Sequence, residues 1–288
     1  MIKECGIELL TQCVDIAYKR NNLPESNCAY CYLSRDSIHK EFEFLITNPD
    51  CLMYGCFDDD TLIGIFGCFF NPDNKWVDCL GPFFKDEWNE KIAVDLFRAA
   101  KSTLTEAVRF NFYFDARNIN CHNLMSEISA ERGDNEFILL LKKEDYVPQE
   151  LKVPVIMYEE KYKDDLIQLH ELVSPDMYLS SDDILSSINK TREVFCALDD
   201  NGNFAGFGVL KHDTEKHCTA ELFTVKEEKR GQGYGWALLN AVVDSAFNNH
   251  NADVLDLVVD KLNTHARGLY YSCGFKLSVE NESHFIKV

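Results

Sequence analysis

The sequence has no apolar stretch near the roughly 20 residues that a membrane-spanning helix requires. Its N-terminal segment also lacks the basic start, apolar centre and small-residue cleavage site of a signal peptide. Basic residues are scarce: 29 lysines and arginines stand against 48 aspartates and glutamates, which gives a formal net charge of -19. Nucleic acids and anionic membranes need a basic protein surface, so this charge argues against both as partners. We expect a cytoplasmic protein.

Apolar residues, by contrast, are plentiful. They make up 46% of the chain and aromatic residues 12%, which is enough for packed cores in a soluble globular protein. The length of 288 residues suits two domains of ordinary size. The acidic surface is compatible with a cationic or amine substrate, because it raises the local concentration of cations. It also serves solubility, so charge alone does not identify the substrate.

The twelve cysteines do not form the dense pattern of a disulfide scaffold. Most of them lie in apolar, strand-like segments, where a reduced thiol behaves as a small buried hydrophobic group. One CxxC pair, Cys28 and Cys31, has no second pair and no HxxxH sequence to complete four zinc ligands. The sequence therefore predicts no metal site.

The chain repeats one order of elements. Residues 56–67 and 196–208 each read as an apolar run, an Asp/Asn/Gly turn and a second apolar run, which is typical of a β-hairpin. After each hairpin the pattern predicts a strand, a long helix, a short strand, a shorter helix and closing strands. In the first half the strand is 76–84, the long helix 88–107, the short strand 110–114 and the closing strand 136–142. In the second half the strand is 218–225, the long helix 233–249, the short strand 254–259 and the closing strands 275–279 and 284–287. Two α+β domains of one plan, 1–146 and 152–288, explain the repeat, with a seam in the charged, proline-containing segment 142–154.

Three glycines alternate with other residues in "RGQGYGWALL", which runs from Arg230 to Leu239. An apolar helical stripe begins at once, so the glycines lie before and inside the first turn of a helix. A helix N-terminus offers unpaired N–H groups and partial positive charge, and glycine lets an anion approach them closely. Arg230 adds a fixed positive charge, so the loop is suited to a pyrophosphate.

Three classes of cofactor could use such a loop. A Walker loop is excluded because no Gly-Lys-Ser/Thr is present. A dinucleotide-binding fold is excluded because the spacing is GxGxG and too few residues follow for further βαβ units. Coenzyme A remains.

Two motifs in the second half resemble those of the GNAT superfamily of acyl-CoA N-acyltransferases. The pyrophosphate motif Arg/Gln-x-x-Gly-x-Gly/Ala matches Arg230-Gly-Gln-Gly233-Tyr-Gly235, and a second motif matches "NTHARGLYYSCGF", from Asn263 to Phe275. The resemblance implies two tandem GNAT-like domains of three layers, each a mixed, mostly antiparallel sheet flanked by helices. The first half has no Arg-Gly-x-Gly at the matching strand-to-helix junction. We therefore expect it to be a degenerate copy that has lost its coenzyme site.

The resemblance also implies roles for single residues. The backbone of the glycine loop binds the pyrophosphate, the end of the preceding strand pairs with the pantetheine amides, and an asparagine caps the next helix. The residues expected to bind the coenzyme are Thr224, Val225, Arg230, Gly231, Gln232, Gly233, Tyr234, Gly235, Trp236 and Asn263. Tyr270 is expected to donate a hydrogen bond to the departing thiolate, and Glu221, or a chain of waters, to take a proton from the amine. Cys273 is expected to be a core thiol and not a nucleophile.

The expected activity is direct transfer of an acetyl group from acetyl-CoA, as co-substrate, to a primary amine of a small molecule or peptide, without a metal. Two alternatives stay open: a non-catalytic module that binds or senses acyl-CoA, and a transferase for another acyl group. Segment 170–185 is expected to help choose the acceptor, and within it 180–183 either caps a helix or lines an amine site. The chain is expected to be a monomer with pseudo-dimeric halves or a homodimer.

Overall fold

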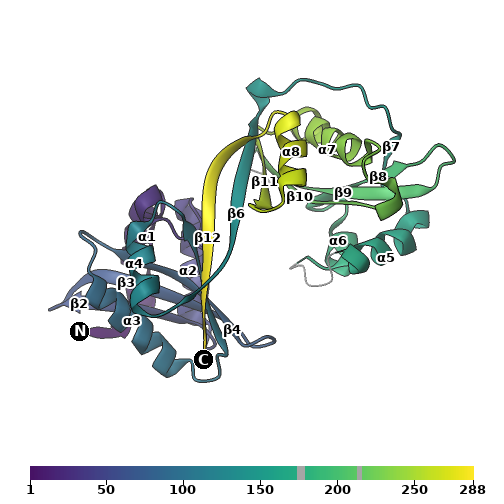
Figure 1. Cartoon of the computed structure of the whole chain (residues 1–288). Coiled ribbons are helices and arrows are strands. Elements are labelled where there is room, and N and C mark those ends of the chain that lie inside the picture. Colours follow the sequence, from purple (N-terminus) through teal and green to yellow (C-terminus); the bar gives the residue numbers. More distant parts are fainter. Residues whose placement is uncertain (174–178, 213–215) are drawn as a thin grey trace. The chain divides into compact units, whose positions relative to one another are not determined.

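The computed structural model describes residues 1–173, 179–212 and 216–288 (Figure 1). The chain divides into two compact units. Unit 1 consists of Met1–Glu136 and Val279–Val288, and unit 2 of Phe137–Ser278.

Both units repeat one order of elements: strand, two helices, three strands, helix, strand, helix, strand. Unit 1 contains β1 (Ile2–Glu4), α1 (Leu10–Asn21), α2 (Arg35–Thr47), β2 (Leu52–Asp58), β3 (Thr61–Asn71), β4 (Trp76–Phe84), α3 (Glu90–Thr103), β5 (Arg109–Asp115) and α4 (Ile119–Glu127). Unit 2 contains β7 (Val155–Met157), α5 (Lys163–Val173), α6 (Ser181–Ser187), β8 (Arg192–Leu198), β9 (Phe204–His212), β10 (His217–Val225), α7 (Tyr234–Asp244), β11 (Val254–Asp260) and α8 (Thr264–Ser272). Two closing strands, β6 (Glu131–Lys142) and β12 (Lys276–Lys287), cross the boundary between the units. The predicted tandem α+β plan is confirmed.

Each unit contains a mixed, mostly antiparallel sheet. The strand order is β1-β2-β3-β4-β5-β12 in unit 1 and β6-β11-β10-β9-β8-β7 in unit 2. The parallel neighbours are β4 with β5 and β10 with β11. Both predicted hairpins are present, as β2–β3 and β8–β9.

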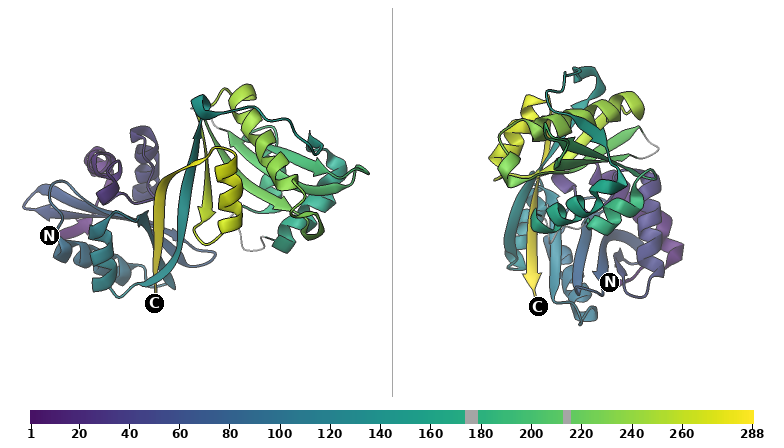
Figure 2. Two further views of the ribbon diagram at one scale, coloured as in Figure 1. Left: turned by 45° about the horizontal axis from the view of Figure 1, so that its top comes forward. Right: turned by 90° about the vertical axis from the view of Figure 1, so that its right-hand side faces the viewer.

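Helices cover both faces of each sheet. In unit 1, α1 and α2 pack in one apolar cluster and α3 and α4 in the other; neighbouring residues of β3 alternate between them, Ile65 in the first and Phe66 in the second. In unit 2, α5 and α6 cover one face and α7 and α8 the other (Figure 2, teal against light green and yellow). This is the three-layer arrangement that the family resemblance implies. Among the described residues, none of the helices combines the length and apolar character needed to cross a bilayer.

The domain limits expected from the sequence differ from the units in two segments. Residues 137–146 belong to unit 2, because Phe137, Leu139 and Leu141 of β6 pack in its core. Residues 279–288 belong to unit 1, because β12 pairs antiparallel with β5 from Asn281 to Lys287. The sequence suggested two short closing strands separated by polar residues, whereas β12 is continuous through them.

Candidate functional site

The strands β10 and β11 separate before they end. Their parallel pairing covers three positions, from His217 opposite Val254 to Thr219 opposite Asp256. Both strands continue beyond it, β10 to Val225 and β11 to Asp260. The sheet of unit 2 therefore opens on this side of β10, next to the loop that leads into α7.

Two of the three loop glycines have backbone conformations that other residues rarely adopt. Gly231 has φ +72° and Gly233, the N-cap of α7, has φ +91°, both in the left-handed region. Gly235 has no such requirement, and an added Cβ would lie at 3.7 Å from Leu269 and 3.8 Å from Val225. The first two glycines shape the turn, and the third keeps space free in front of the separated strands.

The start of α7 presents its backbone to a ligand. The carbonyl of Gly233 accepts the N–H of Ala237 at 2.9 Å, and the N–H groups of the first turn have no partner one turn earlier in the helix. Gln232 folds back, with Nε2 donating to the carbonyl of Glu228 at 2.8 Å, and Arg230 Nε donates to the carbonyl of Val225 at 3.2 Å. Free amides beside a guanidinium suit an anionic ligand.

A cavity of about 320 Å³ lies between these elements. The predicted site residues that line it are Thr224, Val225, Arg230, Gly231, Gly235, Asn263 and Tyr270. The others in the predicted set, Glu221, Gln232, Gly233, Tyr234 and Trp236, are not among its lining residues. Tyr234 is 8% exposed and packs in the core, so only its backbone can serve a ligand.

Thr224 gives this cavity an unsatisfied polar atom. Its side chain is buried, and Oγ1 has no hydrogen-bond partner in the part of the chain that the structure describes. A buried hydroxyl without a partner is costly, so the position favours a ligand that can hydrogen-bond it.

The opposite wall comes from α8. Asn263 caps this helix by accepting the N–H of Ala266 at 3.1 Å, as predicted. Tyr270 lies about two turns further along α8, with its ring centroid 6.3 Å from Phe223 and 6.2 Å from Phe275. Burial raises the pKa of Tyr270 to about 12, so its hydroxyl keeps its proton at neutral pH.

Glu221 lies in a β-bulge of β10. The register shifts between Ala220 and Leu222, and these two residues pack in different apolar clusters although a regular strand would give them one face. Because of this bulge, counting four residues back from Val225 does not place Glu221 on the same face of the strand.

The carboxylate of Glu221 is bound to a guanidinium. Arg192 donates to both of its oxygens, with Nη2 to Oε1 at 3.0 Å, and Lys211 Nζ lies at 3.9 Å. The Glu221 side chain is only 2% exposed. Its role as a base stays a prediction.

Two further predictions concern Cys273 and segment 170–185. Cys273 accepts a hydrogen bond from Asn240 at 3.3 Å, burial raises its pKa, and it does not line the cavity. In the segment, residues 174–178 lie outside the described part of the chain. Ser180 and Asp183 form a reciprocal capping box at the start of α6, so the capping use of 180–183 is confirmed.

Sequence reasoning missed five residues that line the cavity: Val173, Phe223, His265, Ala266 and Leu269. Three of them lie inside the "NTHARGLYY" stretch, and Phe223 immediately precedes Thr224, so their proximity to predicted residues was a usable signal.

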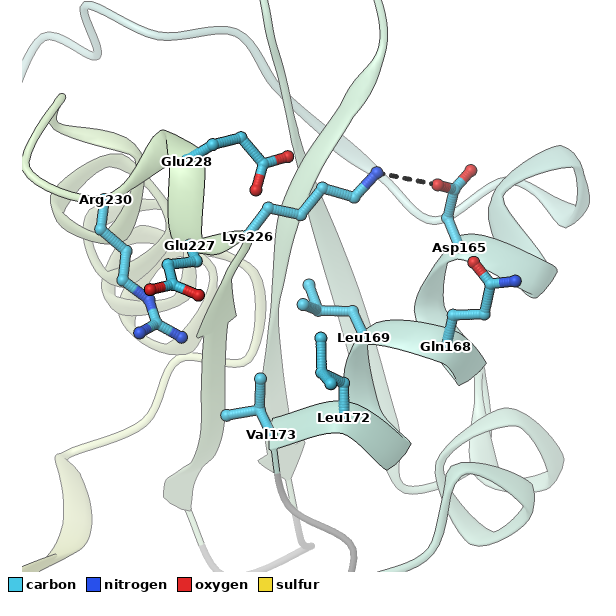
Figure 3. Close-up of a pocket in the computed structure, with 9 residues that line it drawn as sticks. All are labelled: Asp165, Gln168, Leu169, Leu172, Val173, Lys226, Glu227, Glu228 and Arg230. Carbon is cyan, nitrogen blue, oxygen red and sulfur yellow. Dashed lines mark hydrogen bonds and ion pairs between the residues drawn. The ribbon is translucent and has the colours of Figure 1, made fainter.

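A second cavity, of about 520 Å³, adjoins the first (Figure 3). Its walls are α5, with Leu169 and Leu172, and the charged segment that begins at Lys226, whose Nζ lies 3.0 Å from Asp165 Oδ1. Arg230 borders both cavities.

Residues 158–275 match the family model described as "Acetyltransferase (GNAT) family". This segment is a GNAT acetyltransferase domain. The match contains both cavities and the motifs on which the resemblance was based. A comparison with curated proteins finds no match for the chain.

Solved structures show the same fold over both halves. A GCN5-related N-acetyltransferase from Sphaerobacter thermophilus has a TM-score of 0.79 at 12% identity, covering 100% of this chain and 95% of the other. A tandem GNAT protein from the clavulanic acid biosynthesis pathway has 0.71 at 11%, covering 100% and 98%. A putative acetyltransferase from Pyrococcus horikoshii has 0.59 at 14%, covering 100% and 89%. At such identities the likeness extends to the fold alone, and that fold is the tandem GNAT arrangement.

Proposed function

We propose that unit 2 transfers an acyl group from coenzyme A to an amine, with acetyl-CoA as donor and a primary amine of a small molecule or peptide as acceptor. One observation carries the proposal. A single cavity joins the open start of α7, the separated end of β10 and the Tyr270 side of α8. The match of this segment to acetyltransferases supports the same reaction.

The cavity fits coenzyme A at three points. The bare N–H groups after Gly233 and the guanidinium of Arg230 suit a pyrophosphate. The open edge of β10 at Val225 and the unsatisfied Oγ1 of Thr224 suit the amides of pantetheine. The missing side chain at Gly235 leaves room for this chain to pass. Bound acyl-CoA supplies an activated thioester; the protein supplies its position and polarisation.

Tyr270 is proposed to act as a hydrogen-bond donor to the sulfur. Proton transfer from a phenol with a pKa of about 12 to a free thiolate with a pKa of about 8.5 would cost about 5 kcal/mol of free energy. A hydrogen bond that strengthens as charge develops on the sulfur has no such cost.

The acceptor is proposed to approach from the α5 side, through the cavity in Figure 3. Glu227 and Glu228 line it and attract a cationic amine. The amine must then lose a proton, and Glu221 is proposed to receive it directly or through water. Because Arg192 holds this carboxylate, the relay through water is the form that the geometry favours.

A non-catalytic acyl-CoA sensor is the second candidate. The ion pair of Glu221 favours it, since a carboxylate bound by a guanidinium at both oxygens is accounted for without a catalytic role. We also propose a cytoplasmic location, because all twelve cysteines are free, as is usual in a reducing compartment.

The test combines binding and turnover. Calorimetry with CoA and acetyl-CoA should give one site, and an amine and peptide panel should release free CoA; acyl chains of increasing length test other donors. Gly233→Val should abolish binding, whereas Gly202→Val, which introduces the same strain at φ +78° in a hairpin turn, should bind normally. Tight binding without turnover on any amine would favour the sensor. No binding by the wild type would refute both.

A further inference from the structure

Three side chains that can ligate metals come together in unit 1: His122 of α4 and Glu282 and His284 of β12. Glu282 and His284 are two positions apart in a strand, so they point to one face of the sheet. They lie opposite Phe114 and Phe112 of β5. One nitrogen of each ring and one carboxylate oxygen lie within 4.8 Å of one another. None of this is used by the site proposed in unit 2.

These side chains are largely buried, and three of their polar atoms lack hydrogen-bond partners among the described residues. The side chains of Glu282 and His284 are each 9% exposed, and that of His122 is 29% exposed. Both ring nitrogens of His284 and Oε2 of Glu282 have no hydrogen-bond partner among the described residues.

A backbone contact fixes the direction of His122. Its Nε2 lies 3.0 Å from the carbonyl oxygen of Ala116, which can only accept, so we assign the ring proton to Nε2. The lone pair is then on Nδ1, 3.8 Å from Oε2 of Glu282. A backbone carbonyl that orients an imidazole in this way is the usual outer support of a metal-binding histidine.

Glu282 is oriented by two donors on one oxygen. Its Oε1 accepts from Arg132 at 2.6 Å and from Asn135 at 3.2 Å. The other oxygen, Oε2, is left facing the two rings, with Nε2 of His284 at 3.5 Å. Ring packing holds His284 as well, because it stacks on Phe114 with centroids 5.3 Å apart.

Three lone-pair atoms thus converge in a buried place. We propose that His122, Glu282 and His284 bind one divalent transition-metal ion, for which Zn²⁺ is the favoured species. Two imidazoles and a carboxylate form a set that zinc accepts, with water in the fourth tetrahedral position. Such ligand atoms stand about 3.3 Å apart at normal zinc bond lengths. The two separations from Glu282 Oε2 are slightly longer, so small side-chain movements complete the set.

The equivalent place in unit 2, where α8 packs near β6, shows that the fold does not require this cluster. His122 is the fourth residue after the asparagine that caps its helix, and α8 has Arg267 at that position. Arg267 stacks on the ring of Phe137 in β6, 4.7 Å from its centroid, and Leu139 beyond it is fully buried. An arginine stacked on an aromatic ring therefore serves the same architecture, and the histidine and glutamate cluster in unit 1 needs a separate reason.

A bound ion would link two elements of unit 1, the C-terminal strand β12 and the helix α4. Two ligands lie in the segment 279–288, and the third lies in α4. The ion therefore adds a link between α4 and β12 that the unfolded chain lacks, so binding should stabilise unit 1.

The experiment uses the full chain after chelation and dialysis into metal-free buffer. Calorimetry with Zn²⁺ should give one equivalent bound and a higher Tm. Titration with Co²⁺ should give the visible d–d bands of tetrahedral nitrogen and oxygen ligation, without the charge-transfer absorption of a thiolate. No stoichiometric uptake would overturn the proposal and leave an ordinary ion pair. A thiolate spectrum would also overturn it, because the ion would then be bound by cysteines.

Variants separate this site from other metal-binding groups. His122→Ala removes a partly exposed ring, and Glu282→Gln keeps an acceptor for Arg132 while it removes the charge. Each should weaken Zn²⁺ binding by about 100-fold or more and abolish the rise in Tm. His39→Ala, at an exposed histidine of α2, should bind as the wild type does. Equal affinity in His122→Ala and His39→Ala would overturn the assignment.

Discussion

The two units share one framework and differ where a helix begins after the fourth strand. The parallel pairing covers three positions in each unit, Trp76–Asp78 of β4 and His217–Thr219 of β10, and then stops. In unit 1 the following helix is capped by Asn89, whose side chain accepts the N–H of Ile92 at 3.1 Å, and Glu90 adds a negative charge to the first turn. In unit 2 the cap is a glycine without a side chain, and the first turn has no acid.

The loops before these helices differ in the groups that they present. After β4, the carbonyls of Phe84 and Lys85 accept hydrogen bonds from Arg20 of α1, at 2.8 and 2.9 Å. After β10, the loop at Gly231 and Gly233 presents N–H groups. In unit 1 the backbone groups between strand and helix are therefore hydrogen-bonded by the unit's own residues. In unit 2 the corresponding N–H groups can bind an anion. The framework persists in both cases, so function depends on the loop and not on the fold.

A second difference lies inside the sheet. Counted from the start of the parallel pairing, Leu80 in β4 corresponds to Glu221 in β10, and Leu80 is 3% exposed. Unit 1 thus has an apolar residue where unit 2 has a buried carboxylate bound to Arg192. A charged pair at this place is not needed for folding.

Glu221→Leu should have the largest effect of the changes that make unit 2 more like unit 1. It removes the carboxylate from Arg192, whose side chain is 14% exposed, and breaking a buried pair from one side costs about 3–5 kcal/mol. We expect Tm to fall by about 10 °C or more in thermal unfolding. Arg192→Leu combined with Glu221→Leu should recover most of this loss. If the double variant is as unstable as the single one, the comparison with Leu80 fails.

Gly235→Asp would give α7 the acidic first turn that Glu90 gives α3. Gly235 needs no left-handed conformation and has room for a Cβ, so the fold should be kept or slightly stabilised. Repulsion of a phosphate by the new charge at close range is worth about 3 kcal/mol, or about a 100-fold loss of CoA affinity. Gly235→Asn fills the same space without the charge, so it should lose the part of the affinity that comes from crowding pantetheine, and less than Gly235→Asp loses. Equal affinities in calorimetry would mean that no phosphate lies at this helix.

Local patterns predicted much of this fold and part of the site. Hairpin turns, the amphipathic helices and the glycine loop are set by nearby residues, and the sequence located them. The path of β12 was missed because Asn281 and Glu282 look like turn residues, and only pairing with β5 makes them buried strand positions. The bulge at Glu221 was missed for a related reason, since an alternating pattern does not reveal an inserted residue.

The cluster in unit 1 was beyond local patterns altogether. His122 and His284 lie far apart in the sequence, and short ligand spacings such as CxxC or HxxxH do not reveal such a pair. The tertiary contact between α4 and β12 brings them together.

Tyr270→Phe should lower turnover by about 10- to 100-fold with little change in the KM for acyl-CoA, because the hydroxyl stabilises charge that develops during reaction. The residue at this place in α4 is Met125, which has no hydroxyl. With a pKa of about 12, Tyr270 stays protonated through alkaline conditions, so the rate should not fall with its ionisation below about pH 10. Tyr271→Phe, at an exposed neighbour, is the control. Wild-type turnover in Tyr270→Phe would remove it from the mechanism.

The smallest effects should come from removing the asparagine caps of α4 and α8. The first change should lower stability alone, and the second should also lower CoA affinity. Asn118 is 2% exposed and also donates to the carbonyl of Asn27 at 3.0 Å, so Asn118→Ala should cost about 2 kcal/mol of stability and leave CoA affinity unchanged. Asn263 is exposed and borders the cavity, so Asn263→Ala should cost about 0.5–1 kcal/mol and weaken CoA a few-fold. Denaturant unfolding and calorimetry measure the two quantities separately. Loss of CoA affinity in Asn118→Ala would show that unit 1 takes part in coenzyme binding, because Asn118 caps a helix of unit 1 and does not line the cavity.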